Sequence, residues 1–383
     1  MKVRVPDYFK DFKCIGSDCP STCCEGWGIV IDDEMYEDYK NVKGEFGKRL
    51  KSNIIIDEDG DRVFTLKGDN TCSFLNENKL CDIYSEIGEE YLCYTCRQYP
   101  RYTEEFGNLR EVGISLSCPE AARIILKDNK KVAFELSEND EEISSYNDIN
   151  ATLFYELMQC RTIILNLLQR EDLSLDKKLS LILIFAEEIQ VYIDKFEISE
   201  IRLVKEKYLK EDTINSILDK LNKPSDNMKY NYMKEYFNVI NDLEHLKEDI
   251  LGIESLLKLF YEEKDERFYI EKEEEFNNFY KENYFKFQNI CAYFIFRYFM
   301  KAIFDYDLLA KVKFTILSYL IIKDLSMKRW IEKGKLTDDD IMEISYMYSK
   351  DIEHLEENIE TLAEIFEVND KFSLEDIINV LNG

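Results

Sequence analysis

The sequence has few histidines, fewer cationic than anionic side chains, and no long apolar run. Only two of its 383 residues are His, and 78 Asp and Glu outnumber 50 Lys and Arg, for a formal net charge of −28. This deficit argues against nucleic acid and anionic membrane surfaces as partners, because both are held by an excess of Lys and Arg. Apolar runs such as residues 179–186 are far shorter than the roughly 20 residues of a membrane-spanning helix. We therefore expect neither a nucleic-acid partner nor a membrane partner.

The N-terminal segment also lacks the features of a secretory signal. Residues 1–13 carry charge throughout and contain no apolar stretch, so we expect a cytoplasmic protein. In a reducing cytosol, clustered cysteines are more often metal ligands or catalytic groups than disulfides. Cysteine is abundant here, with eleven in the chain. The expected cytoplasmic location therefore favours metal binding by these cysteines over disulfide bonds.

The first third of the chain predicts a small mixed module. Nine of the eleven cysteines lie within the first 118 residues. Residues 53–66 and 101–116 each contain two β-rich runs around a turn, which is the pattern of a hairpin. We expect a cysteine-rich α+β module over residues 1–127.

The remainder of the chain predicts α-helices. Apolar residues recur every three or four positions, most clearly over residues 338–366, as on one face of a helix. The breaker NKPSDN at 222–227 predicts a division into two helical layers. The expected fold class is mainly α, with the small α+β module followed by an α-helical body over residues 128–383.

The clustered cysteines have the composition of an all-thiolate metal site. Thiolates without a nearby histidine suit zinc or an iron–sulfur cluster and exclude calcium and magnesium. Four thiolates satisfy either a tetrahedral zinc or a [4Fe–4S] cluster. A subset of nine residues would supply them: Cys14, Cys19, Cys23, Cys24, Cys72, Cys81, Cys93, Cys96 and Cys118.

The number of metal sites stays open at this point. Nine thiolates suffice for two four-ligand sites, or for one site and several packed thiols. Adjacent residues usually point in different directions, so Cys23 and Cys24 are expected to serve different metal atoms or different sites.

Several of these motifs resemble known families. The segments CPSTCC, CSFLNENKLCDIY and CYTCRQYPR, closed by Cys118, resemble the zinc- or iron-chelating module of the YkgJ family. The opening VPDYFKDFKCIGSDCPSTCCEGW and the later CPEAARIIL are similar to bacterial flagellin lysine-N-methylases. The similarity continues through NICAYFIFRYFMKAIFDYDLLAKVKF in the helical half, although the motifs are specific only in the first 120 residues.

The second resemblance implies an iron–sulfur protein that uses S-adenosylmethionine to methylate lysine side chains of flagellin. The cysteine spacing is not the C-x3-C-x2-C of radical S-adenosylmethionine enzymes, and an amine can displace a sulfonium methyl group directly. No glycine-rich Rossmann turn follows an early strand, so either the metal module or the helical half would hold the cofactor. Two other functions remain open: a non-enzymatic cysteine-rich zinc-binding interaction protein, and an iron–sulfur electron-transfer protein.

Four further residues are candidates for catalysis or cofactor binding. Arg97 and Tyr99 follow a predicted ligand; they would bond to cluster sulfurs, hold substrate or simply form a turn. Arg297 lies in the apolar segment 289–304 and needs an anionic partner, either the cofactor's carboxylate or a structural Asp or Glu. His354 could accept the lysine proton near pH 7, or could be an ordinary residue at the edge of a helix.

Overall fold

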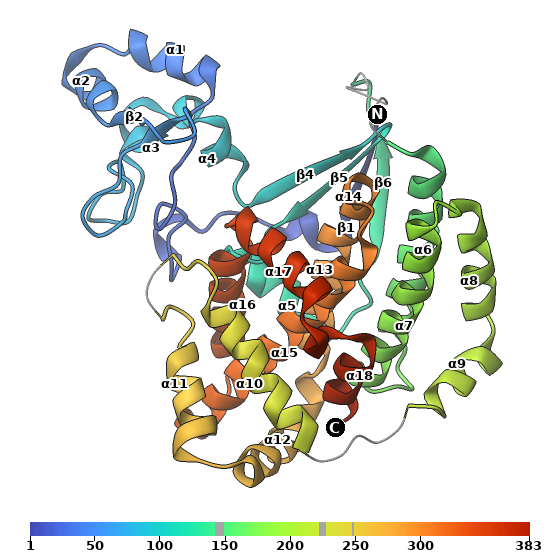
Figure 1. Ribbon diagram of the computed structural model, residues 1–383. Coiled ribbons are helices and arrows are strands. Elements are labelled where there is room, and N and C mark those ends of the chain that lie inside the picture. Colours follow the sequence, from blue (N-terminus) through green and yellow to red (C-terminus); the bar gives the residue numbers. More distant parts are fainter. Residues whose placement is uncertain (142–148, 222–226, 247–248) are drawn as a thin grey trace.

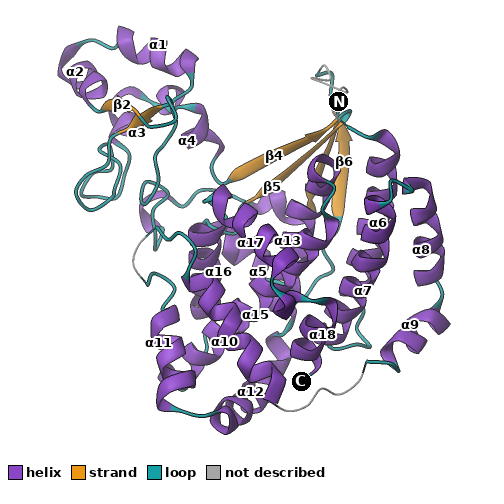
Figure 2. Ribbon diagram, viewed as in Figure 1, coloured by secondary structure: helices purple, strands orange, loops and turns teal. Residues whose placement is uncertain are grey.

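A computed structural model describes residues 1–141, 149–221, 227–246 and 249–383 (Figures 1 and 2). The expected fold class is confirmed: a small mixed module precedes a large helical body, and the strands of the described residues all lie before residue 139. The predicted division at 222–227 falls on residues 222–226, outside the described part of the chain. In the part that is described, no helix combines the length and apolarity needed to cross a membrane.

The cysteine-rich module projects from the body at the upper left of Figure 1. Its elements are α1 (Asp33–Asn41), α2 (Gly44–Ser52), β2 (Ile54–Ile56), β3 (Arg62–Phe64), α3 (Asp82–Ile87) and α4 (Tyr94–Gln98). The predicted hairpin at 53–66 is confirmed, because β2 pairs antiparallel with β3 and Ile54 lies opposite Phe64. The side chain of Asp32 accepts a hydrogen bond from the Met35 N–H at 3.0 Å and so begins α1.

A four-stranded sheet connects this module to the body. Its strands, in spatial order, are β4 (Arg101–Phe106), β5 (Leu109–Ile114), β1 (Lys2–Pro6) and β6 (Phe134–Glu138). Strand β1 is parallel to β5, and the other pairs are antiparallel. The second predicted hairpin is therefore confirmed as β4 and β5. A short 3₁₀ helix, η1 (Asp7–Asp11), follows β1.

The two hydrophobic cores do not divide the chain at residue 127. The module's core lies among residues 29–93, whereas Phe106, Ile114 and helix α5 (Pro119–Leu126) belong to the core of the body. Strand β6 also lies beyond residue 127 and pairs with β1. The boundary between the cores falls between α4 and β4, because the apolar side chains of the sheet and of α5 pack on the body.

The body consists of helices packed around α15, whose residues 310–327 are all buried. Its helices are α6 (Ala151–Leu168), α7 (Leu175–Asp194), α8 (Ile201–Tyr208), α9 (Glu211–Leu218), α10 (Asn227–Asn241), α11 (Ile253–Leu257), α12 (Glu266–Tyr280), α13 (Phe285–Tyr298), α14 (Ala302–Asp305), α15 (Leu308–Lys333), α16 (Asp338–Ile352), α17 (Glu356–Val368) and α18 (Leu374–Asn382). The apolar pattern over 338–366 is divided between α16 and α17. At this break Glu353 and His354 make hydrogen bonds to distant parts of the chain.

Candidate functional site

Five cysteines form an inner thiol group within the core of the module. Cys72 and Cys93 are buried in this core, and three partly buried cysteines pack against it. The inner thiol group consists of Cys24, Cys72, Cys81, Cys93 and Cys96. Burial, followed by the thiolates of Cys24, Cys81 and Cys93, raises the pKa of Cys72 to about 12. These residues come from four separate segments, which the fold of the module brings together.

Four other cysteines form an outer thiol group where the module meets the body. It consists of Cys14, Cys19, Cys23 and Cys118. Cys118 is buried in the body's core at the start of α5, and burial, together with the thiolates of Cys19 and Cys14, raises its pKa to about 11. The pKa of Cys23 is raised chiefly by its hydrogen bond with Cys24 and further by the thiolates of Cys14 and Cys118.

The adjacent residues Cys23 and Cys24 lie where the two thiol groups meet. Their side chains are hydrogen-bonded to each other, and this bond, with help from the Thr22 hydroxyl and the Lys350 ammonium, lowers the pKa of Cys24 to about 7. The further thiol neighbours of Cys24 belong to the inner group, as its thiolate raises the pKa of Cys72. The expectation that the pair serves two metal atoms or sites stays a prediction.

The chemistry of the two thiol groups fits a soft metal. Across the described ranges, no three Cys, His, Asp or Glu side chains are arranged as a ready metal site, and all eleven cysteines are free thiols. A metal cation would nevertheless stabilise the thiolate forms of these crowded cysteines, because a thiol that coordinates a metal is deprotonated. Which cysteines bind a metal, and which metal, stay predictions.

Three aromatic rings meet beside the outer thiol group and form what we call the aromatic cluster: Trp27, Tyr99 and His354. The Trp27 and His354 rings are stacked, with centroids 5.7 Å apart and planes 8° apart. The ring of Tyr99 lies 6.1 Å from Trp27 and 6.0 Å from His354. Burial, and then the thiolate of Cys118, raises the pKa of Tyr99 well above its ordinary value. The cluster thus joins two segments of the module to the end of α16.

A network of hydrogen bonds leads from the aromatic cluster into the body. The Ser117 hydroxyl lies 2.9 Å from His354 Nε2, 3.2 Å from the Tyr99 hydroxyl and 2.8 Å from the Ser115 hydroxyl. Arg297 on α13 donates to the Ser115 hydroxyl at 2.9 Å. Because Ser117 precedes Cys118, the network passes directly beside the outer thiol group.

Glu353 is the anionic partner of Arg297. The Tyr293 and Tyr298 hydroxyls donate to Glu353 Oε2 at 2.9 and 2.8 Å, and Arg297 Nε lies 3.4 Å from the same oxygen. The other carboxylate oxygen, Oε1, and the hydroxyl of Tyr102 are buried without a hydrogen-bond partner among the described residues. Buried polar atoms without partners are uncommon, so this network retains capacity for further hydrogen bonds.

The structure brings together three of the four predicted residues outside the cysteines. Tyr99, Arg297 and His354 share one network, whereas Arg97 is exposed on α4. Trp27 was missed, although its position three residues after the Cys23-Cys24 pair was a local signal. The serines before Cys118 and Glu353 gave no signal, because their partners are distant in sequence.

The environment of His354 makes stability depend on pH. Burial, and then the charges of Arg297 and Lys350, lowers its pKa from 6.5 to about 4. His354 therefore binds a proton less readily in the folded protein than in the unfolded chain. The free energy of unfolding is unaffected by this residue above pH 6.5 and falls as the pH drops from 6.5 to 4. At about 1.4 kcal/mol per pKa unit, this loss is on the order of 3 kcal/mol. Urea unfolding of wild type and His354→Gln should diverge by this amount over the range; parallel profiles would contradict it.

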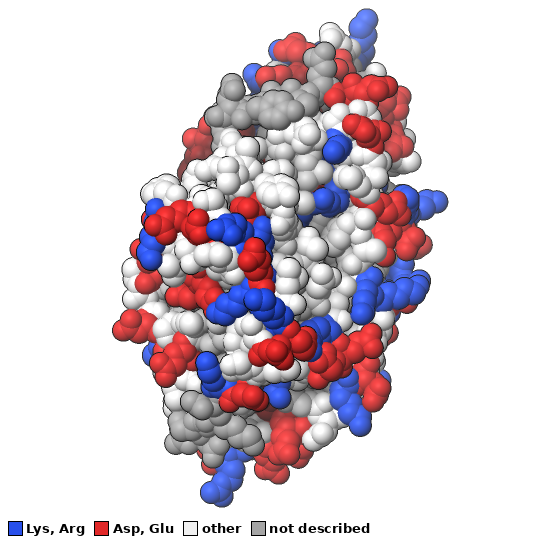
Figure 3. Space-filling model, turned by 90° about the vertical axis from the view of Figure 1, so that its right-hand side faces the viewer, with Lys and Arg blue, Asp and Glu red and all other residues white. Residues whose placement is uncertain are grey.

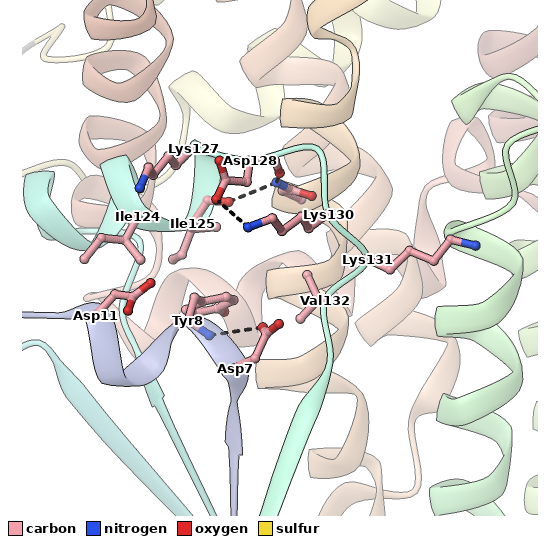
Figure 4. Close-up of a pocket in the computed structure, with 11 residues that line it drawn as sticks. Asp7, Tyr8, Asp11, Ile124, Ile125, Lys127, Asp128, Lys130, Lys131 and Val132 are labelled. Atoms are coloured by element: carbon pink, nitrogen blue, oxygen red, sulfur yellow. Dashed lines mark hydrogen bonds and ion pairs between the residues drawn. The ribbon is translucent and has the colours of Figure 1, made fainter.

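A separate cavity of about 110 Å³ lies between η1 and the loop after α5 (Figure 4). It is lined by Tyr8, Val132 and charged side chains, among which Lys130 lies 3.6 Å from Asp128. Pockets for drug-sized ligands usually measure about 300–1,000 Å³, so this cavity is too small for a nucleoside-sized cofactor. The candidate site is instead the aromatic cluster and its network, which adjoin the outer thiol group.

The fold and the site define a protein in which a thiol-rich module joins a helical body through an aromatic and polar contact. Residues 161–380 match the FliB lysine N-methylase C-terminal domain. This match covers more than half of the chain, and the chain belongs to the FliB lysine N-methylase family. The resemblance to flagellin lysine-N-methylases is thereby confirmed at the level of the family. The match begins at residue 161, so the likeness of the cysteine-rich module to YkgJ stays a prediction.

Curated relatives match a shorter part of the chain. It is 28% identical over 144 residues to the flagellar biosynthetic protein FliU of Salmonella muenchen, covering 34% of this chain and 80% of that protein. Lysine-N-methylases of Salmonella choleraesuis and Salmonella typhimurium are also 28% identical over 144 residues. That alignment spans only 34% of either methylase. No solved structure shows a significant match.

Proposed function

We propose that this protein is a lysine N-methyltransferase that methylates flagellin with S-adenosylmethionine and holds an iron–sulfur cluster on its thiol groups. Family membership supports lysine methylation, and the name of the FliU relative supports a flagellar substrate. The observation that carries the proposal is the contact between the aromatic cluster and the outer thiol group. It joins His354 of the matched domain to Trp27 and Tyr99, while Arg297 bonds to Ser115 close to Cys118.

The aromatic cluster suits the two cations of this reaction. Lysine arrives as an ammonium, and S-adenosylmethionine, when bound, supplies a methyl group on a sulfonium. Faces of Trp and Tyr rings attract cations within about 6 Å. His354, with a pKa of about 4, is neutral at pH 7 and so adds no positive charge to those of Arg297 and Lys350 nearby. We assign Trp27 and Tyr99 to cation binding, and His354 to holding Ser117 and the Trp27 ring.

The outer thiol group supplies four cysteines, the number that a [4Fe–4S] cluster or a tetrahedral zinc requires. Bound to a metal, these thiols would tie the segment of residues 14–24 to α5. That cross-link would hold Trp27, three residues further on, against His354. The inner thiol group would hold a second centre or pack as free thiols, and zinc is the alternative metal.

The net negative charge of the helical body supports a lysine-bearing partner, because it attracts basic segments. Beyond residue 125 the sequence contains 54 Asp and Glu against 34 Lys and Arg, a difference of −20. On the face shown in Figure 3, acidic and basic side chains are interspersed. That face offers no continuous acidic patch, so we attribute attraction of a basic segment to net charge, which speeds encounter.

Replacing Trp27 tests the proposed site. Trp27→Leu keeps an apolar side chain but loses the ring, and a desolvated cation–π contact is worth about 2 kcal/mol, or roughly 30-fold. We expect intact-mass analysis of flagellin to show methyl addition by wild type and a rate lowered by this factor for the variant. Trp330, the second Trp, packs on Phe276 and Phe279 away from the site. Trp330→Leu should keep the wild-type rate; equal losses in both variants would contradict the assignment.

A further inference from the structure

A second histidine forms an oriented pair with a buried carboxylate. His245 follows α10, and its Nδ1 lies 2.5 Å from Oδ2 of Asp351 on α16. The Asp351 side chain is completely buried. Its other oxygen, Oδ1, accepts a hydrogen bond from the Leu246 N–H at 2.9 Å. Two hydrogen bonds therefore fix the carboxylate, and the carboxylate fixes the ring.

The remaining nitrogen of this ring is a free acceptor. With Nδ1 against the carboxylate, the hydrogen of the neutral ring lies on Nδ1 and the lone pair lies on Nε2. Nε2 is buried and has no hydrogen-bond partner among the described residues. A buried nitrogen without a partner is uncommon and calls for an explanation.

The pair lies beside the loop that carries the candidate site. The side chain of Leu246 packs close to Gly26: a Cβ atom added to Gly26 would lie 3.5 Å from Leu246 Cδ1. Lys350, the residue before Asp351, donates to the Thr22 carbonyl at 3.1 Å. The loop of residues 22–27 contains Cys23, Cys24 and Trp27. The residues next to His245 and Asp351 therefore contact the loop that carries Trp27 of the aromatic cluster.

We propose that His245 is the base that accepts the proton of the substrate lysine, with Asp351 as its positioning residue. This inference rests on the proposed function. The ammonium gives one proton to Nε2, and the Asp351 carboxylate balances the imidazolium charge. The neutral amine then forms the new N–C bond while the C–S bond of the sulfonium breaks and its electron pair goes to sulfur. Nε2 is buried although the His245 side chain is 19% exposed, so the substrate lysine must displace the atoms that cover this nitrogen. The released proton leaves to solvent by the same opening before the next transfer.

The two histidines of the chain are thereby assigned different tasks. His354 has two cationic neighbours, Arg297 and Lys350, which disfavour a positive charge on its ring. His245 has a carboxylate at hydrogen-bond distance, as bases that must carry a transient positive charge commonly do. The lysine proton is therefore best received on His245.

His245→Asn separates the chemical role from a structural one. The Asn amide can still donate to Asp351, but it has no basic nitrogen. We expect kcat for flagellin methylation to fall by about 10²–10⁴-fold, the usual contribution of a general base, with unchanged KM for flagellin and unchanged thermal unfolding. His245→Asn with wild-type kcat would overturn the inference and leave the proposed function in place. Wild type without methylation activity would overturn the proposed function and this inference with it.

Imidazole rescue keeps the inference testable where His245→Asn disturbs folding. His245→Ala removes the ring, and added imidazole should restore part of its methylation rate by replacing the base. Asn358→Ala is the matched control, because Asn358 holds the same loop through both backbone groups of Glu244. Its rate should not respond to imidazole. A His245→Ala variant that imidazole fails to activate would overturn the inference.

Discussion

Cys118→Ser is expected to strip metal from the outer thiol group and to lower flagellin methylation by more than about 100-fold. Loss of residues that only orient metal ligands already costs about 10–100-fold in metal affinity or activity, and Cys118 would be a ligand itself. It is buried at the start of α5, and the preceding residue, Ser117, contacts both His354 and Tyr99. Loss of metal there would therefore also loosen the aromatic cluster.

Metal content and methylation measured on the same preparations test this prediction. Cys160→Ser is the matched control, because Cys160 is also buried but lies on α6, outside both thiol groups. Iron and sulfide per protein should fall in Cys118→Ser and stay at the wild-type level in the control. Full metal content in Cys118→Ser would remove this residue from the ligand set. Wild-type protein that contains zinc and no iron would show that the bound metal is zinc and not an iron–sulfur cluster.

Arg297→Met is expected to lower the free energy of unfolding by about 3–5 kcal/mol, the usual result of breaking a buried ion pair. The Glu353 side chain is only 1% exposed, and without the guanidinium its charge would be held by two tyrosine hydroxyls alone. The double variant Arg297→Met/Glu353→Gln should recover part of this loss, because no uncompensated charge is left in the core.

A double-mutant cycle by urea unfolding measures this coupling. Arg123→Met is the matched control, because Arg123 pairs with Glu120 on α5 but has a side chain that is 52% exposed. Exposed pairs contribute about 0–1 kcal/mol, so this variant should be nearly neutral. Strictly additive losses for Arg297 and Glu353 would show that the two side chains do not stabilise each other.

Local elements of this fold followed from the sequence. The two hairpins were predictable, because residues 53–66 and 101–116 each contain two β-rich runs around a turn. Their signals lie within a few residues of each other along the chain. The mainly helical body was equally readable, because a buried helix repeats its apolar residues every three or four positions.

The assembly of the site was not predictable from such signals. Residues 101–126 resemble the module in composition, yet they pack on the body, because the partners of Phe106 and α5 lie in distant helices. Trp27 and His354 stack across more than three hundred residues of sequence, and His245 reaches Asp351 106 positions away. The clustered cysteines and the resemblance of their motifs to known families placed the predicted chemistry near the N-terminus.

Transfer of a labelled methyl group tests the central claim most directly. Flagellin would be incubated with the metal-loaded protein and S-adenosylmethionine that carries an isotopic label in its methyl group, and digested for mass spectrometry. We predict that the label is found on lysine ε-nitrogens, with the rate lowered in Trp27→Leu and kept in Trp330→Leu. Unlabelled lysines after incubation with wild-type protein of verified metal content would contradict the account.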